Sequence, residues 1–172
     1  ATERITPIEG GWANQAFEAF LRPIGVRLDA ESFRLPIAPA DLEAASAALP
    51  SGYGPALLLA PSGAAGDWPA GQWQDLPAAI RTKLPNLRTQ AALGGATAGA
   101  LRQRAAQIAS VDVVLASDPL TVELALLLGI PLVALGREAT SLPKRAGVQG
   151  LGSATSLSQL TGAEVLAALG LA

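Results

Sequence analysis

The clearest hydrophobic pattern in the chain is the tract VDVVLASDPLTVELALLLGIPLVALG at residues 111–136. Two short apolar runs at 111–115 and 131–135, rich in β-branched residues, predict two buried parallel strands. The longer apolar run between them, residues 120–128, predicts a helix. The tract is therefore expected to form a strand–helix–strand crossover.

The turn that opens this helix is the first place to look for function. Asp118 or Ser117 is expected to cap the helix, Pro119 fits its first turn, and Gly129 is expected to end it. Ligands of open α/β sheets bind beside the carboxyl ends of the strands, where this turn is expected to lie. Ser117, Asp118 and Thr121 are the first candidate residues.

Strands and helices alternate regularly from residue 55 onward, which predicts a three-layer α/β/α sandwich around a Rossmann-like parallel sheet. We expect residues 1–54 to be a helical linker or approach segment and 55–172 to be the Rossmann-like domain. Arg102 and Arg104 are expected to point outward, Trp73 to lie in the core, and 137–158 to be irregular. The remaining predicted elements are strands at 55–60 and 88–93 and helices at 12–21, 40–49, 73–84, 99–109 and 163–169.

The amino-acid composition limits the kinds of function that the chain can have. The chain has 172 residues, 50% of them hydrophobic, which suits one domain with one core. It has no Cys and no His, so thiolate and histidine chemistry, the common zinc sites and the Ser-His-Asp triad are excluded, and we expect no metal or cofactor. A net charge of −2 with scattered arginines argues against a nucleic-acid partner. No apolar run reaches the ~20 residues of a membrane span, and the N-terminus has no signal-peptide pattern, so we expect a cytoplasmic protein.

Three loops carry the candidate site residues. In the loop after residue 60, Ser62 and Gly63 could offer amides and a hydroxyl to a phosphate, or could simply turn the chain. Asp118 could contact a ligand or only cap its helix, and Glu123 could point into a cleft or into solvent. In the loop from Gly136, the guanidinium of residue 137 could pair with a phosphate or remain solvated.

Two segments together resemble a known family. PSGAAGDWPAGQW at 61–73 and SDPLTVELALLLGIPLVALG at 117–136 are similar, in order and spacing, to the C-terminal half of the ADP-heptose:lipopolysaccharide heptosyltransferases, which have the GT-B fold. The resemblance covers about two thirds of the chain. It implies one half of a GT-B architecture that binds a nucleotide-diphosphate sugar. An N-terminal acceptor domain, or a partner protein, would complete the enzyme and supply its catalytic base.

The resemblance also implies site residues for the sugar donor, and none of them is catalytic. They are Ser62, Gly63, Ser117, Asp118, Thr121, Glu123, Gly136 and Arg137. The loop from Gly136 would close over the donor.

Some positions depart from the family pattern and keep two other readings open. Pro119-Leu120 stand where the family has Ser-Gly, Glu123 stands where it has His, and 70–72 hold no Lys. A degenerate glycosyltransferase-like scaffold that acts as a protein-interaction module would fit these changes. The third reading is a small α/β enzyme with Asp118 and Glu123 as an acid/base pair.

Overall fold

The computed structural model describes residue 12 and residues 16–27, 34–95 and 97–171. Its centre is a sheet of five strands in the order β2-β1-β3-β4-β5, in which all neighbours are parallel. The carboxyl ends of parallel strands share one edge of a sheet, so the loops that follow β1, β3 and β4 are neighbours. The strands are β1 (Ala56–Ala60), β2 (Arg88–Ala91), β3 (Val113–Ala116), β4 (Leu132–Leu135) and β5 (Val148–Leu151).

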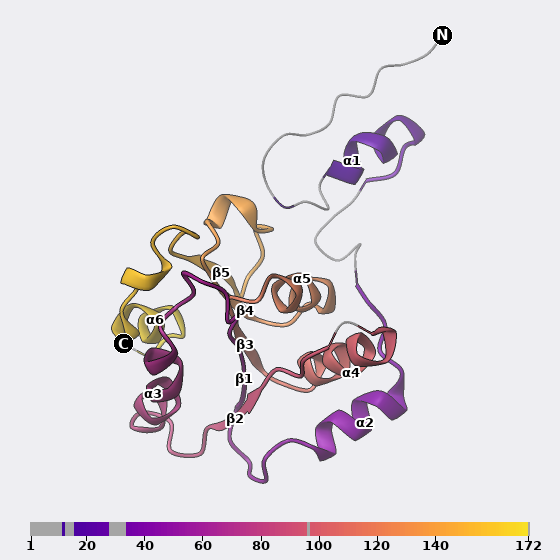
Figure 1. Cartoon of the computed structure of the whole chain (residues 1–172). Coiled ribbons are helices and arrows are strands. Elements are labelled where there is room, and N and C mark those ends of the chain that lie inside the picture. The colour runs from indigo at the N-terminus through magenta and orange to yellow at the C-terminus, as the bar shows by residue number, and fades with distance from the viewer. Residues whose placement is uncertain (1–11, 13–15, 28–33, 96, 172) are drawn as a thin grey trace.

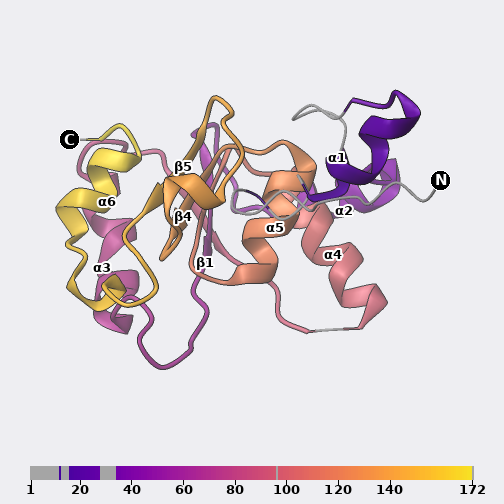
Figure 2. The ribbon, with the colours of Figure 1, turned by 90° about the horizontal axis from the view of Figure 1, so that it is seen from above.

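Helices cover both faces of the sheet, as Figure 1 and Figure 2 show. α3 and α6 lie on one face, α4 and α5 lie on the other, and α2 packs outside against α4. α1 lies farthest from the sheet. This arrangement confirms the predicted three-layer, Rossmann-like α/β fold. The helices are α1 (Ala16–Leu21), α2 (Pro39–Ala47), α3 (Ala70–Arg81), α4 (Ala98–Ala109), α5 (Pro119–Leu128) and α6 (Gly162–Ala168), with 3₁₀ turns η2 (Arg22–Ile24), η3 (Ala139–Ser141) and η4 (Leu157–Gln159).

The sheet separates two buried clusters of apolar side chains. Leu57 and Leu115 belong to the cluster on the side of α3 and α6, together with Trp73, whose predicted place in the core is confirmed. Leu58 and Val114, which neighbour them along the same strands, belong to the cluster on the side of α4 and α5. Burial on both faces explains why these strands are continuously apolar rather than alternating.

The central crossover forms as predicted, within two residues at each boundary. β3, α5 and β4 follow one another through residues 113–135. Asp118 is the N-cap, and its side chain accepts a hydrogen bond from the Thr121 amide. Gly129 ends α5 with a φ of +75°, a left-handed conformation that suits glycine.

Several predicted elements need correction. The segment 137–158 is not irregular throughout, because it contains β5. α3 begins at Ala70 rather than Trp73, since small and polar residues form its first turn without an apolar signal. Arg104 does not point outward: the residue is only 9% exposed. The predicted helix at 12–21 is α1 in part, and its residues 13–15 lie outside the described part of the chain.

The N-terminal segment contacts the α/β unit at separate points. The indole N–H of Trp12 donates to Glu123 on α5, and the amide of Leu35 donates to the carbonyl of Leu127 on the same helix. Across the described residues, no helix combines the length and the apolar character that a bilayer crossing requires.

Candidate functional site

The loops that follow β1 and β3 are joined by a hydrogen bond between two predicted site residues. The backbone N–H of Ser62 donates to Oγ of Ser117 at 2.9 Å. The loops meet because β1 and β3 are paired, with Ala60 opposite Ala116 at the carboxyl edge. Residues 55 positions apart in sequence therefore share one rim.

Asp67 organises the loop after β1. Its carboxylate accepts hydrogen bonds from the amides of Gly63 at 3.0 Å and Trp68 at 2.7 Å. Burial raises the pKa of Asp67, but hydrogen bonds from the Ser117 hydroxyl, these two amides and the Ser62 hydroxyl outweigh it and lower the pKa below 3.8. The carboxylate is therefore ionised at neutral pH and holds the loop in one conformation.

Trp68 anchors the same loop to the core. Its indole N–H donates to the carbonyl of Leu160 at 2.7 Å, and its ring meets that of Trp73 edge to face, with centroids 5.2 Å apart. Two amides at the turn of the loop, those of Ala65 and Gly66, have no hydrogen-bond acceptor among the described residues. The loop is thus fixed at its ends and presents unpaired donors between them.

Asp118 is the centre of a second group at the start of α5. Its Oδ2 accepts from the amide of Thr121 at 2.9 Å and from the Thr121 hydroxyl at 2.6 Å. Nη1 of Arg104 lies 3.1 Å from the same oxygen, and the Arg104 side chain also donates to the carbonyl of Leu93. This ion pair is the reason why Arg104 turns inward. The predicted capping role of Asp118 is confirmed, and Thr121 is fully buried beneath it.

Glu123 forms a third group one turn further along α5. One carboxylate oxygen accepts from the indole of Trp12 at 3.1 Å, and the other lies 3.5 Å from Nη2 of Arg137. About a third of each charged side chain of this pair remains exposed. Glu123 therefore neither extends freely into solvent nor stands alone in a cleft, because it links the N-terminal segment to the loop after β4.

Gly136 begins the loop that carries Arg137. Its φ is +74°, and its amide donates to the carbonyl of Leu151 at 2.8 Å. A Cβ on Gly136 would meet Leu157 at 3.3 Å, so the loop turns tightly against η4. The loop after β4 is held next to β5 and does not extend away from the sheet.

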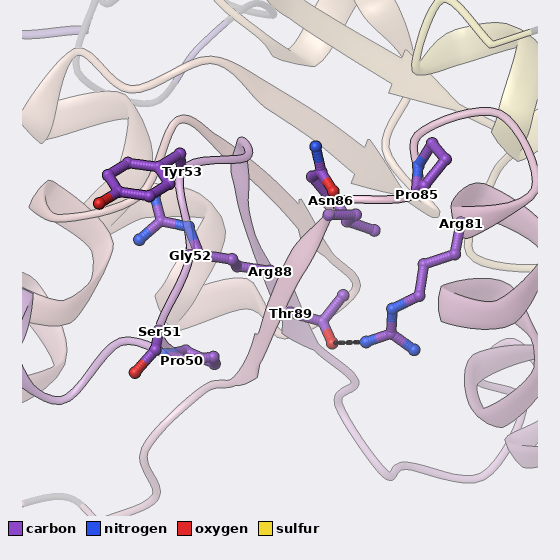
Figure 3. Close-up of a pocket in the computed structure, with 10 residues that line it drawn as sticks. Pro50, Ser51, Gly52, Tyr53, Arg81, Pro85, Asn86, Arg88 and Thr89 are labelled. Carbon is purple, nitrogen blue, oxygen red and sulfur yellow. Dashed lines mark hydrogen bonds between the residues drawn. The ribbon is translucent and has the colours of Figure 1, made fainter.

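The predicted residues thus fall into three local groups after neighbouring strands, and in the described structure no side-chain hydrogen bond or ion pair joins one group to another. Sequence reasoning missed three residues of these groups, Asp67, Arg104 and Trp12. The sequence contains a signal for Asp67, because an aspartate four residues after a loop glycine can accept a hydrogen bond from that glycine's amide, as Asp67 does from Gly63. Three surface hollows of the described structure contain none of the predicted residues: they lie on residues 50–53 with 81 and 85–89 (Figure 3), within 139–150, and on 41–48 with 90–107.

The rim formed by these loops has both attractive and repulsive features for an anion. The amide of Leu120, in the first turn of α5, has no acceptor among the described residues, and the helix dipole adds partial positive charge there. Arg137 supplies a cation about a third of whose side chain is exposed. Asp67, Asp118 and Glu123 supply three carboxylates beside two guanidinium groups. The described ranges contain no cluster of three acidic side chains suited to a metal ion.

Comparison with known proteins adds a fold-level match. No family model matches the sequence, and no curated protein matches it either. The structure is similar to that of ADP-heptose lps heptosyltransferase II of E. coli, with a TM-score of 0.62 and 17% sequence identity. The match covers 80% of this chain and 52% of the E. coli chain, so this chain spans about half the length of that protein. At this level of identity, the match shows similarity of fold.

Proposed function

We propose that this chain is the donor-binding half of a heptosyltransferase-like glycosyltransferase and that it binds a nucleotide-diphosphate sugar. The observation that carries the proposal is the Ser62–Ser117 hydrogen bond, which joins the loops after β1 and β3 at the carboxyl edge of the sheet. Ligands of open α/β sheets bind at this edge. The fold similarity to a heptosyltransferase supports the same assignment.

In this proposal the two loops and the loop after β4 surround the diphosphate. The unpaired amides of Ala65, Gly66 and Leu120 are donors for phosphate oxygens. Arg137 would exchange its contact with Glu123 for one with the diphosphate, where a guanidinium binds bidentately. These groups would stabilise the charge of the departing nucleoside diphosphate.

The remaining predicted site residues have supporting roles. Gly63 and Gly136 provide the tight turns of their loops, both with positive φ. Asp118 and Thr121 fix the first turn of α5, where the Leu120 amide has no acceptor among the described residues. The chain itself supplies no catalytic base in this scheme.

Transfer of the sugar would require an N-terminal acceptor domain or a partner protein. Residues 1–54 would then be the linker, and 55–172 the donor domain. Exposed apolar side chains on the linker support a partner surface: Phe20 is 53% exposed and Ile24 71% exposed. Contact with a second domain would bury them.

A second candidate function is that of a protein-interaction module with a degenerate donor site. Three carboxylates at the rim favour it, because Asp67, Asp118 and Glu123 would repel a diphosphate and already pair with both nearby guanidinium groups or with loop amides. Glu123 in particular is already paired with Arg137, the cation that the donor would need. In this alternative the exposed apolar residues of the linker would bind the partner, and no donor would bind.

Calorimetric titration with ADP, UDP, GDP and their sugar derivatives tests the proposal. Binding of at least one of these compounds is expected, and Arg137→Gln should weaken it about tenfold, since it removes a charge-assisted contact. Arg102→Gln, an exposed arginine on α4, is the matched control and should have no effect. Absence of heat with every compound at several millimolar would refute donor binding. Loss of partner association in Phe20→Ser, with no nucleotide bound, would favour the interaction module.

A further inference from the structure

The loop after β1 encloses a negatively charged group that belongs to the chain itself, the carboxylate of Asp67. Both of its oxygens are used: Oδ2 accepts from the Gly63 amide at 3.0 Å, and Oδ1 accepts from the Trp68 amide at 2.7 Å. The hydroxyl groups of Ser117 and Ser62 also donate to this carboxylate. Four donors from the loops after β1 and β3 therefore converge on one anion.

Backbone amides orient the two hydroxyl groups toward the carboxylate. Oγ of Ser117 accepts from the amide of Ser62 at 2.9 Å, and Oγ of Ser62 accepts from the amide of Ala64 at 3.2 Å. A hydroxyl group has one proton besides its acceptor positions, so each of these hydroxyls still has its proton to donate. Part of the donor arrangement is thus set by the backbone of the loop, independently of the carboxylate.

Proteins bind oxyanions from solution with donors arranged in this way. Concave turns in which several backbone N–H groups point at one place are anion sites, and hydroxyl groups add further donors. Two more amides of the same turn, those of Ala65 and Gly66, have no acceptor in the described structure. Residues 63–66 are exposed and Asp67 is partly exposed, so an anion can reach the loop from solution.

We propose that the loop after β1 is an oxyanion site that the Asp67 carboxylate occupies as an internal ligand, so that a phosphate group binds there only by displacing this side chain. Asp67 inhibits binding in two ways, because it holds donors that a phosphate needs and places a negative charge beside them. The inference rests on the proposed function for the identity of the displacing group. Its own consequence is that the unaltered chain binds phosphate more weakly than a chain without this carboxylate.

Nuclear magnetic resonance titration of the full chain with inorganic phosphate, at pH 7 and constant ionic strength, tests the proposal. Asp67→Ala should bind phosphate at least about tenfold more tightly than the unaltered chain, because the donors are freed and a repulsive charge is removed. The amide signals of Gly63 and Trp68 should shift most on binding. Thermal unfolding gives a second readout, in which phosphate should raise the Tm of Asp67→Ala more than that of the unaltered chain.

Two further variants separate occupation of the site from simple charge repulsion. Asp67→Asn removes the charge but leaves a side chain of the same size among the donors, so its phosphate affinity should rise by less than about threefold. Asp75→Ala removes a carboxylate from an exposed position on α3 and should leave phosphate affinity unchanged. Formate, a carboxylate small enough to take the place of the missing side chain, should bind Asp67→Ala more tightly than Asp67→Asn.

The indole N–H of Trp68 shows whether the loop keeps its place without Asp67, because it donates to the carbonyl of Leu160. An unchanged indole signal in Asp67→Ala means that the loop is intact. If this signal is displaced, phosphate or formate should restore it, since an external anion then replaces the carboxylate.

Three results would overturn the proposal. They are equal phosphate affinity of Asp67→Ala and the unaltered chain, equal gains in Asp67→Ala and Asp67→Asn, and a displaced Trp68 indole signal that neither anion restores. Nucleotide-sugar binding by the unaltered chain together with the first result would uphold the donor function and reject the internal ligand. Tight phosphate binding by Asp67→Ala, with no nucleotide sugar bound by the unaltered chain, would refute the donor function and support the internal ligand.

Discussion

The two edges of the sheet use charge in different ways. At the carboxyl edge, Asp118 is paired with Arg104 and Glu123 with Arg137, and Asp67 accepts loop amides. At the amino edge, Arg81 at the end of α3 and Arg88 at the start of β2 have no carboxylate beside them in the described structure, and Gly54 packs closely against the backbone of Asn86. Ion pairs and a carboxylate thus hold the loops in place at one edge, whereas at the other edge close backbone packing and single hydrogen bonds from or to charged side chains do so.

The largest effect is expected at Gly54, where the backbone packs most closely at the amino edge. Gly54→Ala should destabilise the fold by about 3 kcal/mol, because the new methyl group would overlap the carbonyl of Asn86 and force the walls apart. Urea denaturation measures the loss. Gly71→Ala, in the first turn of α3 with open space around it, is the control and should not destabilise the protein. Equal stability of the two variants would show that the backbone around Gly54 can shift to accommodate a methyl group at no cost in stability.

A smaller loss is expected when a charge is removed at the carboxyl edge. Arg104→Met should cost about 2 kcal/mol, since it leaves the Asp118 carboxylate and the Leu93 carbonyl without their partner. Arg102→Met, two residues away with a side chain 70% exposed, should change stability by less than about 0.5 kcal/mol. Thermal or urea unfolding compares them. If the two variants were equally stable, the inward orientation of Arg104 would contribute nothing to the stability of the fold.

The smallest effect is expected to depend on pH. Hydrogen bonds lower the pKa of Asp67 in the folded state, so ionised Asp67 stabilises the fold above the ordinary pKa near 3.8, and this contribution is lost as the pH falls through the lower folded value. Asp67→Asn should therefore cost about 1 kcal/mol at pH 7 and less at pH 3. Urea denaturation at both pH values tests this. Asp75→Asn, at an exposed position on α3, is the control. A cost for Asp67→Asn that is the same at both values would contradict the assignment.

The fold could be predicted where all local signals agree. Residues 111–136 combine β-branched strands, a capping aspartate and a terminal glycine, and β3, α5 and β4 form there. β5 was missed because VQGL contains a single β-branched residue and a glycine. That glycine is required, since a Cβ on Gly150 would lie 2.3 Å from the carbonyl of Arg137. Tertiary packing, which is invisible in the local pattern, selects this residue.

The loops that form the candidate site could be predicted from the sequence, but the side chains that pair with the site residues could not. The rule that parallel strands end at one edge correctly brought Ser62 next to Ser117. Arg104 was wrongly expected to point outward because a charged side chain favours solvent unless it has a buried partner. The sequence does not show that Asp118 is this partner. Gln107, three residues further along α4, is buried too and bonds both to the amide of Leu93 and to the carbonyl of Ala91. A polar stripe on an alanine-rich helix face is the signal that could have indicated inward hydrogen bonding.

The burial of Trp12 affects how the protein should be handled. Its side chain is 4% exposed, belongs to the apolar cluster beside α5, and holds the Glu123 carboxylate through the indole N–H. Trimming the polypeptide to residues 55–172 would remove this indole, uncover apolar surface and release Glu123 from one of its two partners. The freed carboxylate would then pair more tightly with Arg137 and compete with any phosphate there. Affinities measured on a trimmed protein would underestimate those of the longer chain.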